Sequence, residues 1–136
     1  MSKNEAIQVT DAEWDVLDAI WNEPGQAAGR IIELVQLHRD WNHRTIRTLL
    51  RRLIEKGAVN VEIDGAKHLY RAAVDRNTCV RSATQSFSER FFSGSVRSLL
   101  LHLVEHQDLS TDEIEELRKR LDEKQRALGK KKKGKS

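Results

Sequence analysis

Three arginines within residues 42–57 recur at a spacing that places them on one side of a helix. Arg44, Arg47 and Arg51 are separated by three and four residues, as neighbours on a helical face are. A guanidinium group presents a flat fork of donors that fits O6 and N7 of guanine and also binds phosphate. Thr48 lies among them, and its methyl or hydroxyl group can read thymine or a neighbouring base. A charged helix face by itself is more often merely solvated, so the elements around it decide between solvation and a nucleic-acid surface.

The same segment predicts the helix that would hold these side chains outward. Asn42 is a good N-cap, and Gly57 is a stop signal. Between them an apolar stripe recurs at i, i+3, i+4, i+7 and i+8. It consists of Ile46, Leu49, Leu50, Leu53 and Ile54. We expect the stripe to be buried, so that the basic side faces outward.

A β-hairpin is predicted directly after this helix. Apolar and polar residues alternate from Val59 to Ile63, Asp64-Gly65 is a two-residue turn signal, and a second strand would return over residues 66–71. This register would put Glu62 opposite Lys67, and the hairpin would set Lys67 against a flanking phosphate. The predicted DNA-contacting residues are then His43, Arg44, Thr45, Arg47, Thr48, Arg51 and Lys67.

Two further helices are expected before this unit. Thr10 and Glu13 form a capping box for a helix that Pro24-Gly25 stops, and its apolar residues are Trp14, Leu17, Ile20 and Trp21. A second, poorly capped helix would run over about residues 28–38 and bury Ile31, Ile32 and Val35, with Leu37 as a further candidate. Three helices followed by a hairpin indicate a winged helix-turn-helix, a mainly α fold with a small β-hairpin.

From about Asp75 onward the pattern is helical. One apolar face would contain Val80, Thr84, Phe87 and Phe91. Ser93-Gly94-Ser95 interrupts it, a second stripe begins at Val96, and a capping box at residues 110–113 opens a last helix. We expect a winged-helix DNA-binding domain at residues 1–74, a helical dimerisation domain at 75–128 and a disordered basic tail at 129–136.

The helical half carries more apolar surface than a small arm hides by itself. The predicted dimerisation residues are Phe87, Phe91, Leu99, Leu100, Leu103 and Leu117. Two-fold pairing of two such arms would bury them. The alternative is that they pack on the DNA-binding domain of their own chain.

Composition limits the other classes of function. The net charge of +3 over 136 residues conceals a balance of −5 in residues 1–40, +4 in 41–76, −1 in 77–129 and +5 in the tail. No apolar run approaches a membrane span, and the polar start predicts no secretory signal. One cysteine, Cys79, cannot form an internal disulfide. These features favour a cytoplasmic protein without a membrane partner.

Other reactive side chains give weaker signals. His102 and His106 lie at i and i+4, but two ligands do not complete a tetrahedral metal site, so we expect no metal. Cys79 is predicted to be a small buried hydrophobe. The chain shows neither a glycine-rich phosphate loop nor a nucleophile–base arrangement, which indicates no enzyme and no cofactor. The lysine tail could add non-specific DNA affinity.

Over about residues 7–125 the sequence resembles the BlaI/MecI family of penicillinase and methicillin-resistance repressors. The segments that carry the likeness are Val9-Thr10-Asp11-Ala12-Glu13-Trp14, Ile20-Trp21, Trp41, Thr45-Ile46, Thr48-Leu49, Arg52-Leu53-Ile54, Lys56-Gly57-Ala58, Phe87, Arg90-Phe91, Gly94, Leu109-Ser110, Glu113 and Glu116-Leu117. The resemblance implies a homodimeric repressor on inverted-repeat operators of double-stranded DNA. It also implies a response to β-lactams through a sensor-linked protease that cleaves the repressor. Where the family has an Asn-Phe cleavage pair, this chain has His102-Leu103.

Two alternatives from other classes remain open. One is a ligand- or metal-responsive winged-helix regulator, which would need a pocket or a ligand cluster in the helical arm. The other is an adaptor whose winged helix no longer binds DNA, against which the three outward arginines count.

Overall fold

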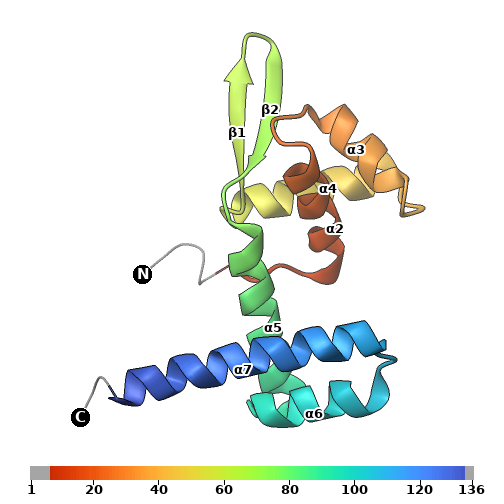
Figure 1. Ribbon diagram of the computed structural model, residues 1–136. Coiled ribbons are helices and arrows are strands. Elements are labelled where there is room, and N and C mark those ends of the chain that lie inside the picture. The colour runs from red at the N-terminus through yellow and green to blue at the C-terminus, as the bar shows by residue number, and fades with distance from the viewer. Residues whose placement is uncertain (1–6, 134–136) are drawn as a thin grey trace. The chain divides into compact units, whose positions relative to one another are not determined.

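Six helices and one β-hairpin make up residues 7–133, the part of the chain that the computed structural model describes (Figure 1). Contacts divide the chain into two units, one ending at Gly94 and the other beginning at Ser95. The first unit contains α2 (Asp11–Asn22), α3 (Ala28–Gln36), α4 (His43–Glu55), β1 (Val59–Asp64), β2 (Lys67–Ala72) and α5 (Arg76–Phe92). The second contains α6 (Val96–His106) and α7 (Thr111–Lys133). The predicted mainly helical fold with one hairpin is confirmed.

Capping side chains set the beginnings of α2 and α4. Oγ1 of Thr10 accepts a hydrogen bond from the backbone N–H of Glu13, and Oε1 of Glu13 accepts one from the N–H of Thr10 at 3.0 Å. Oδ1 of Asn42 accepts from the N–H of Thr45 at 2.9 Å. Both predicted caps are therefore confirmed. Helix α3 has no such bond at Ala27, as its sequence predicts.

The core of the first unit lies between α2, α3 and α4. The buried face of α4 consists of Ile46, Leu49, Leu50 and Leu53, with Ile54 partly buried beside them. Ile31, Ile32 and Val35 of α3 are buried as predicted. Leu37 is not: it lies just past Gln36, the last residue of α3, and 74% of its surface is exposed. The helix ends about two residues earlier than predicted, so Leu37 does not turn inward.

In the β1–β2 hairpin each residue of β1 pairs two residues further along β2 than predicted. Asp64 lies opposite Lys67 and Glu62 opposite Leu69, so the two-residue turn is Gly65-Ala66 rather than Asp64-Gly65. Gly65 has φ +63° whereas Ala66 does not have a positive φ, and a type II′ turn shows this pattern with glycine first. The predicted Glu62–Lys67 pair is wrong. Glu62 instead accepts a hydrogen bond from Nε of Arg71 at 2.9 Å.

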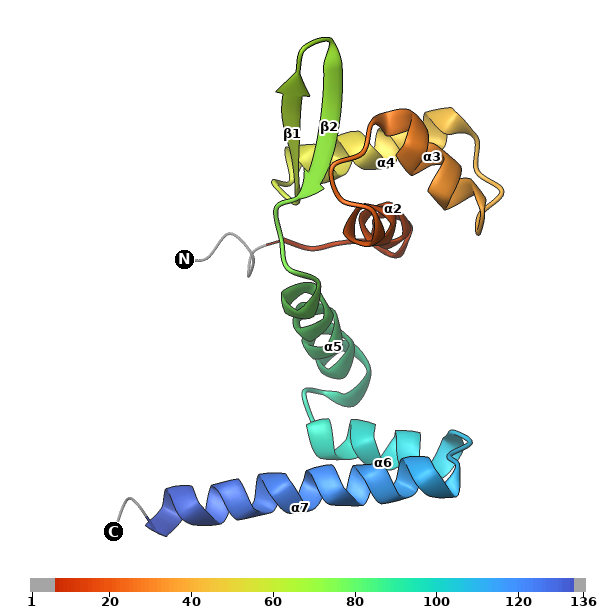
Figure 2. The same cartoon turned by 45° about the horizontal axis from the view of Figure 1, so that its top comes forward.

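Backbone hydrogen bonds join the base of the hairpin to the loop after α2. The N–H of Tyr70 donates to the carbonyl of Gln26 at 2.9 Å, and the N–H of Gly25 donates to the carbonyl of Tyr70 at 3.1 Å. Nε1 of Trp21 donates to the carbonyl of Val74 at 3.1 Å. These bonds fix the base, while the rest of the hairpin projects beyond the helices of its unit (Figures 1 and 2). The hairpin therefore forms a wing with a set position relative to α4.

Helix α5 follows the wing. Oδ2 of Asp75 caps it by accepting from the N–H of Thr78, and Ser93 ends it in the left-handed region at φ +52°. The domain boundary expected after residue 74 lies immediately before this cap. The core of the first unit nevertheless extends past that point, because Cys79 is buried in it.

In the second unit, α6 and α7 run side by side in opposite directions (Figures 1 and 2). Ser110 and Glu113 form the predicted capping box at the start of α7. The expectation of disorder from Gly129 onward is wrong for residues 129–133, which continue α7 to Lys133. Lysine is a good helix former and a single glycine costs only about 1 kcal/mol. Residues 134–136 lie outside the described part of the chain. Among the described helices, none has the length and apolarity that crossing a bilayer requires.

One buried ion pair connects the beginning of α2 to the end of α4. Glu13 is 1% exposed, and its Oε1 contacts Nζ of Lys56, which also donates to the carbonyl of Gln8 at 2.7 Å. Burial by itself would raise the pKa of Glu13. Hydrogen bonds from Lys56 and Thr10, together with the charge of Lys56, outweigh burial and lower that pKa below its ordinary value of 4.5. The pair therefore stabilises the fold while Glu13 is ionised.

We expect Glu13→Gln to lower the free energy of unfolding at pH 7 by about 1–3 kcal/mol, because Lys56 keeps its charge and loses its partner. Since the folded state holds the lower pKa, the wild-type advantage is complete above about pH 4.5 and shrinks as the pH falls further. Urea unfolding at pH 7 and below pH 4.5 measures this difference. Glu62→Gln, at an exposed pair, is the control and should change stability by about 0.5 kcal/mol or less. An equal gap between wild type and Glu13→Gln at all pH values would contradict the assignment.

Candidate nucleic-acid interface

The seven side chains predicted to contact DNA are all exposed. They are His43, Arg44, Thr45, Arg47, Thr48 and Arg51 on α4 and Lys67 on β2. Within α4, Arg44, Arg47, Thr48 and Arg51 occupy i, i+3, i+4 and i+7, so they share one face. That face is opposite the buried stripe that contains Ile46, and the structure therefore brings the predicted recognition residues of α4 together.

Several arginines of the first unit outside this face form ion pairs, whereas those on this face form none within the described residues. Four arginines elsewhere in that unit have a carboxylate partner: Arg30 with Glu23, Arg39 with Asp15, Arg71 with Glu62 and Arg76 with Asp18. Among the described residues, no carboxylate oxygen lies within 4.0 Å of Arg44, Arg47 or Arg51. Their guanidinium donors are therefore available to an external acceptor. A phosphate or the edge of guanine has the matching geometry.

Thr48 presents its methyl group rather than its hydroxyl proton. Its Oγ1 donates to the backbone carbonyl of Arg44 at 3.0 Å, so the only proton of the hydroxyl is used within the helix. The hydroxyl oxygen can still accept a hydrogen bond from a base amino group, and the methyl can pack against the methyl of thymine. The structure thus removes the Thr48 hydroxyl as a donor to a base edge.

A shallow hollow of about 310 Å³ lies beside the recognition face at the start of α4. It is lined by Asn42, Arg44, Thr45, Thr48, Leu49 and Arg52. Arg52 is a basic residue of this surface that the sequence pattern did not single out. The signal was present, because Arg52 follows Thr45 and Thr48 at i+7 and i+4, but the predicted face followed only the row that begins at Arg44.

In the observed hairpin register, Lys67 no longer lies opposite Glu62. It forms no ion pair within the described part of the chain. Arg71 pairs with Glu62, and Lys67, at the first position of β2, has no carboxylate within 4.0 Å among the described residues. Asp64 is its cross-strand neighbour and reduces the positive field there. The wing therefore offers a lysine ammonium, a point charge suited to phosphate rather than to a base edge.

Most predicted dimerisation residues are exposed in the single chain. Phe87, Phe91, Leu100, Leu103 and Leu117 each expose between 41% and 61% of their surface. Leu99 is the exception and is buried, so it is not free for a partner in the way its neighbours on the stripe are. On α5 the rings of Phe87 and Phe91 lie 4.9 Å apart between centroids. Each of the two units therefore exposes several large apolar side chains.

Within the described residues, the structure offers little for metal or redox chemistry. No group of three or more histidine, cysteine or acidic side chains is placed to hold a metal. The rings of His102 and His106 lie 4.5 Å apart. Cys79 is buried as predicted, and burial, with the nearby charge of Asp75, raises the pKa of its thiol. A reactive thiolate needs the opposite shift.

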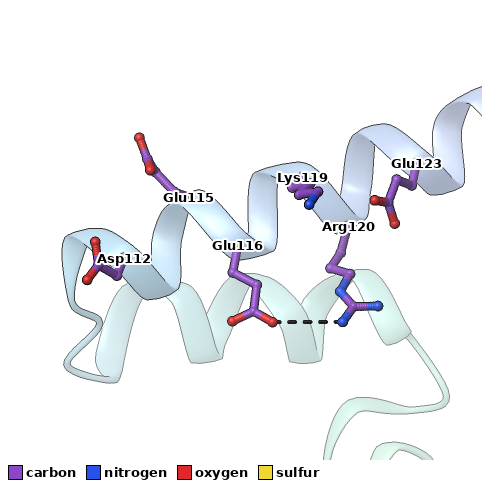
Figure 3. Close-up of a pocket in the computed structure, with 6 residues that line it drawn as sticks. All are labelled: Asp112, Glu115, Glu116, Lys119, Arg120 and Glu123. Atoms are coloured by element: carbon purple, nitrogen blue, oxygen red, sulfur yellow. Dashed lines mark ion pairs between the residues drawn. The ribbon is translucent and has the colours of Figure 1, made fainter.

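The hollow along α7 is a surface feature of mixed charge. Figure 3 shows it with the side chains of Asp112, Glu115, Glu116, Lys119, Arg120 and Glu123, all from α7. Glu116 and Arg120 form an ion pair at 3.9 Å within it. A single helix face that exposes all six of these side chains provides no enclosed site for a small ligand.

Comparison with known proteins gives matches along most of the chain. A family model described as penicillinase repressor matches residues 9–123. The chain is 38% identical over 121 residues to the methicillin resistance regulatory protein MecI of Mammaliicoccus sciuri, which covers 89% of this chain and 98% of that protein. It is 34% identical over 116 residues to the penicillinase repressor of Bacillus licheniformis, covering 85% and 91%. A mutant of MepR from S. aureus, solved bound to an oligodeoxyribonucleotide, is similar in fold with a TM-score of 0.50 at 20% identity over 93% of this chain and 84% of that one.

Proposed function

Because the chain belongs to the penicillinase repressor family, we propose that it represses transcription by binding operator DNA through α4 and the wing. The observation that carries this proposal is the row of exposed arginines on α4, opposite its buried face. An α-helix fits the major groove of B-DNA, and residues near its N-terminus reach the base edges. Relatives named as regulators of methicillin resistance and of penicillinase support the same function.

Within this interface the side chains divide into base-reading and backbone-binding groups. Arg47 lies one turn into α4 and reads a base, and the methyl of Thr48 contacts a thymine. Arg51 lies further from the beginning of the helix and binds phosphate. Lys67 on the wing binds a flanking phosphate. Phosphate contacts set the register of the protein on the duplex, while base contacts supply the sequence preference.

The repressor binds as a homodimer through its helical arm. The exposed apolar side chains of α5, α6 and α7 support this, because Phe91, Leu100 and Leu103 cost free energy when they face water. A two-fold symmetric dimer presents two copies of α4 and therefore matches an inverted-repeat operator. Linking the two half-site contacts raises the affinity far above that of one.

The regulated genes belong to a β-lactam response, and repression ends when a sensor-linked protease cuts the helical arm in the cytoplasm. The relatives' names support the first statement. For the second, His102 and Leu103 are exposed on α6. The carbonyl of Leu103 accepts a helical hydrogen bond from Gln107 at 3.0 Å, so cleavage requires local opening of α6.

We expect Arg47→Ala to weaken binding to the operator by about 1–3 kcal/mol and to relax preference at one base position. Lys67→Ala should weaken binding to all duplexes alike. It should also reduce the slope of log Kd against log salt by about 0.9, the contribution of one phosphate contact. Fluorescence anisotropy on the upstream region of the gene and on random duplex DNA separates the two effects. Arg81→Ala, at an exposed arginine of α5, is the matched control and should change neither. Equal losses on both duplexes for Arg47→Ala would refute the base-reading role.

We expect the full chain to sediment as a dimer at micromolar concentration and Leu103→Asp to shift it toward monomer. The same variant should lose operator affinity, because the half-site contacts are no longer linked. Leu37→Asp is the control, since Leu37 is an exposed leucine of the first unit outside the arm. Analytical ultracentrifugation of all three proteins measures the effect. A monomeric wild type would contradict the dimer.

We expect β-lactam induction to produce fragments that end at His102. A cut after His102 would inactivate the repressor, because it separates α7 and part of α6 from the rest of the apolar arm. Mass spectrometry of the repressor, taken from cells that carry the native locus, detects these fragments. His102→Ala tests whether the protease recognises the residue before the cut, because alanine keeps α6 helical. Leu103→Pro is less suitable, because proline would break α6 as well as alter the cleaved bond. Derepression with the chain intact would exclude the cleavage mechanism.

A further inference from the structure

The charge of α7 changes sign along its length. Residues 111–123 contain six acidic and three basic side chains, whereas residues 124–136 contain seven basic and no acidic ones. The change coincides with the end of the family match at residue 123. The C-terminal basic segment, which we define as residues 124–131, lies past the end of that match.

The described basic groups of this segment are exposed and carry no ion pair within the described chain. Lys124, Arg126, Lys130 and Lys131 all lie on the helical part of the segment and are exposed. None has a carboxylate oxygen within 4.0 Å among the described residues. In the N-terminal half of the helix, Arg120 pairs with Glu116 (Figure 3). These four groups are therefore accessible to an external anion.

Stabilisation of the helix end does not account for this many cations. Positive side chains favour the last turn of a helix by about 0.3–1 kcal/mol each. Lys124 and Arg126 lie before that turn, and Arg126 and Lys130 stand at i and i+4, where like charges destabilise a helix. This repulsion between like charges is relieved when a polyanion binds to the helix and neutralises them.

We propose that the C-terminal basic segment binds the phosphate backbone of double-stranded DNA, as a second, sequence-independent contact of the repressor. The inference rests on the proposed function, which supplies DNA as the partner. Lysine ammonium groups suit this role because they bind phosphate as point charges and do not read base edges. A lipid surface fits less well: the segment contains one leucine and no aromatic residue, whereas interfacial helices need a broad apolar face.

The test uses the full-length protein and a glutamine variant that combines Lys124→Gln, Arg126→Gln, Lys130→Gln and Lys131→Gln. Binding to the upstream region and to a random duplex of equal length is measured by anisotropy over a series of salt concentrations. We expect the glutamine variant to bind both duplexes about tenfold or more weakly at low salt. The slope of log Kd against log salt should fall by about 0.9 for each phosphate that the variant no longer neutralises. The ratio of the two affinities should stay unchanged.

A matched variant with Lys124→Arg, Lys130→Arg and Lys131→Arg keeps the charge at all four positions, because position 126 is already arginine, and should retain the wild-type slope. Equal slopes for the wild type and the glutamine variant would overturn the inference. So would binding of the wild type to phosphatidylserine vesicles that the glutamine variant does not show, while DNA binding stays the same. The wild type could show no preference for the upstream region while the glutamine variant still has a lower salt slope on the random duplex. In that case the segment binds DNA and the proposed operator recognition fails.

Discussion

The burial of one side of α4 is the constraint on which the interface depends. Ile46, Leu49 and Leu53 pack against α2 and α3, and the helical period then forces Arg44, Arg47 and Arg51 outward. Asn42 fixes where the helix begins, which sets the side chains that stand near its tip. The same packing that stabilises the first unit therefore orients the recognition face, and no separate device is needed to present it.

Within the described residues, the ion pairs of the first unit lie away from the recognition face of α4. Arg30 of α3, Arg71 of β2 and Arg76 of α5 have carboxylate partners. The buried Glu13–Lys56 pair joins the beginning of α2 to the end of α4. The arginines of the recognition face have none among the described residues. A cation without an ion pair on a rigid helix keeps its donors ready for DNA, and its electrostatic attraction also speeds encounter with the duplex.

The sequence predicted the elements whose signals are local. Caps at Thr10 and Asn42 and the stripe on α4 follow from short spacings, and all were confirmed. The hairpin register was wrong because Asp64-Gly65 and Gly65-Ala66 are both acceptable two-residue turns, and the choice depends on contacts with the loop at Gln26 that are distant in sequence. Leu37 was misplaced because α3 lacks a clear stop. Arg52 was missed because α4 has two overlapping rows of polar side chains, one that begins at Arg44 and one that ends at Arg52. Only the packing of the folded chain shows which of them face the same surface.

We propose that α4 reads guanines in the major groove as part of a two-fold symmetric dimer. Methylation interference on the upstream region tests it directly, since methylation at guanine N7 blocks the acceptor that an arginine fork uses. We expect interference at guanines in two half-sites whose centres lie one helical turn, or a whole number of turns, apart. Binding that is indifferent to N7 methylation would contradict the claim.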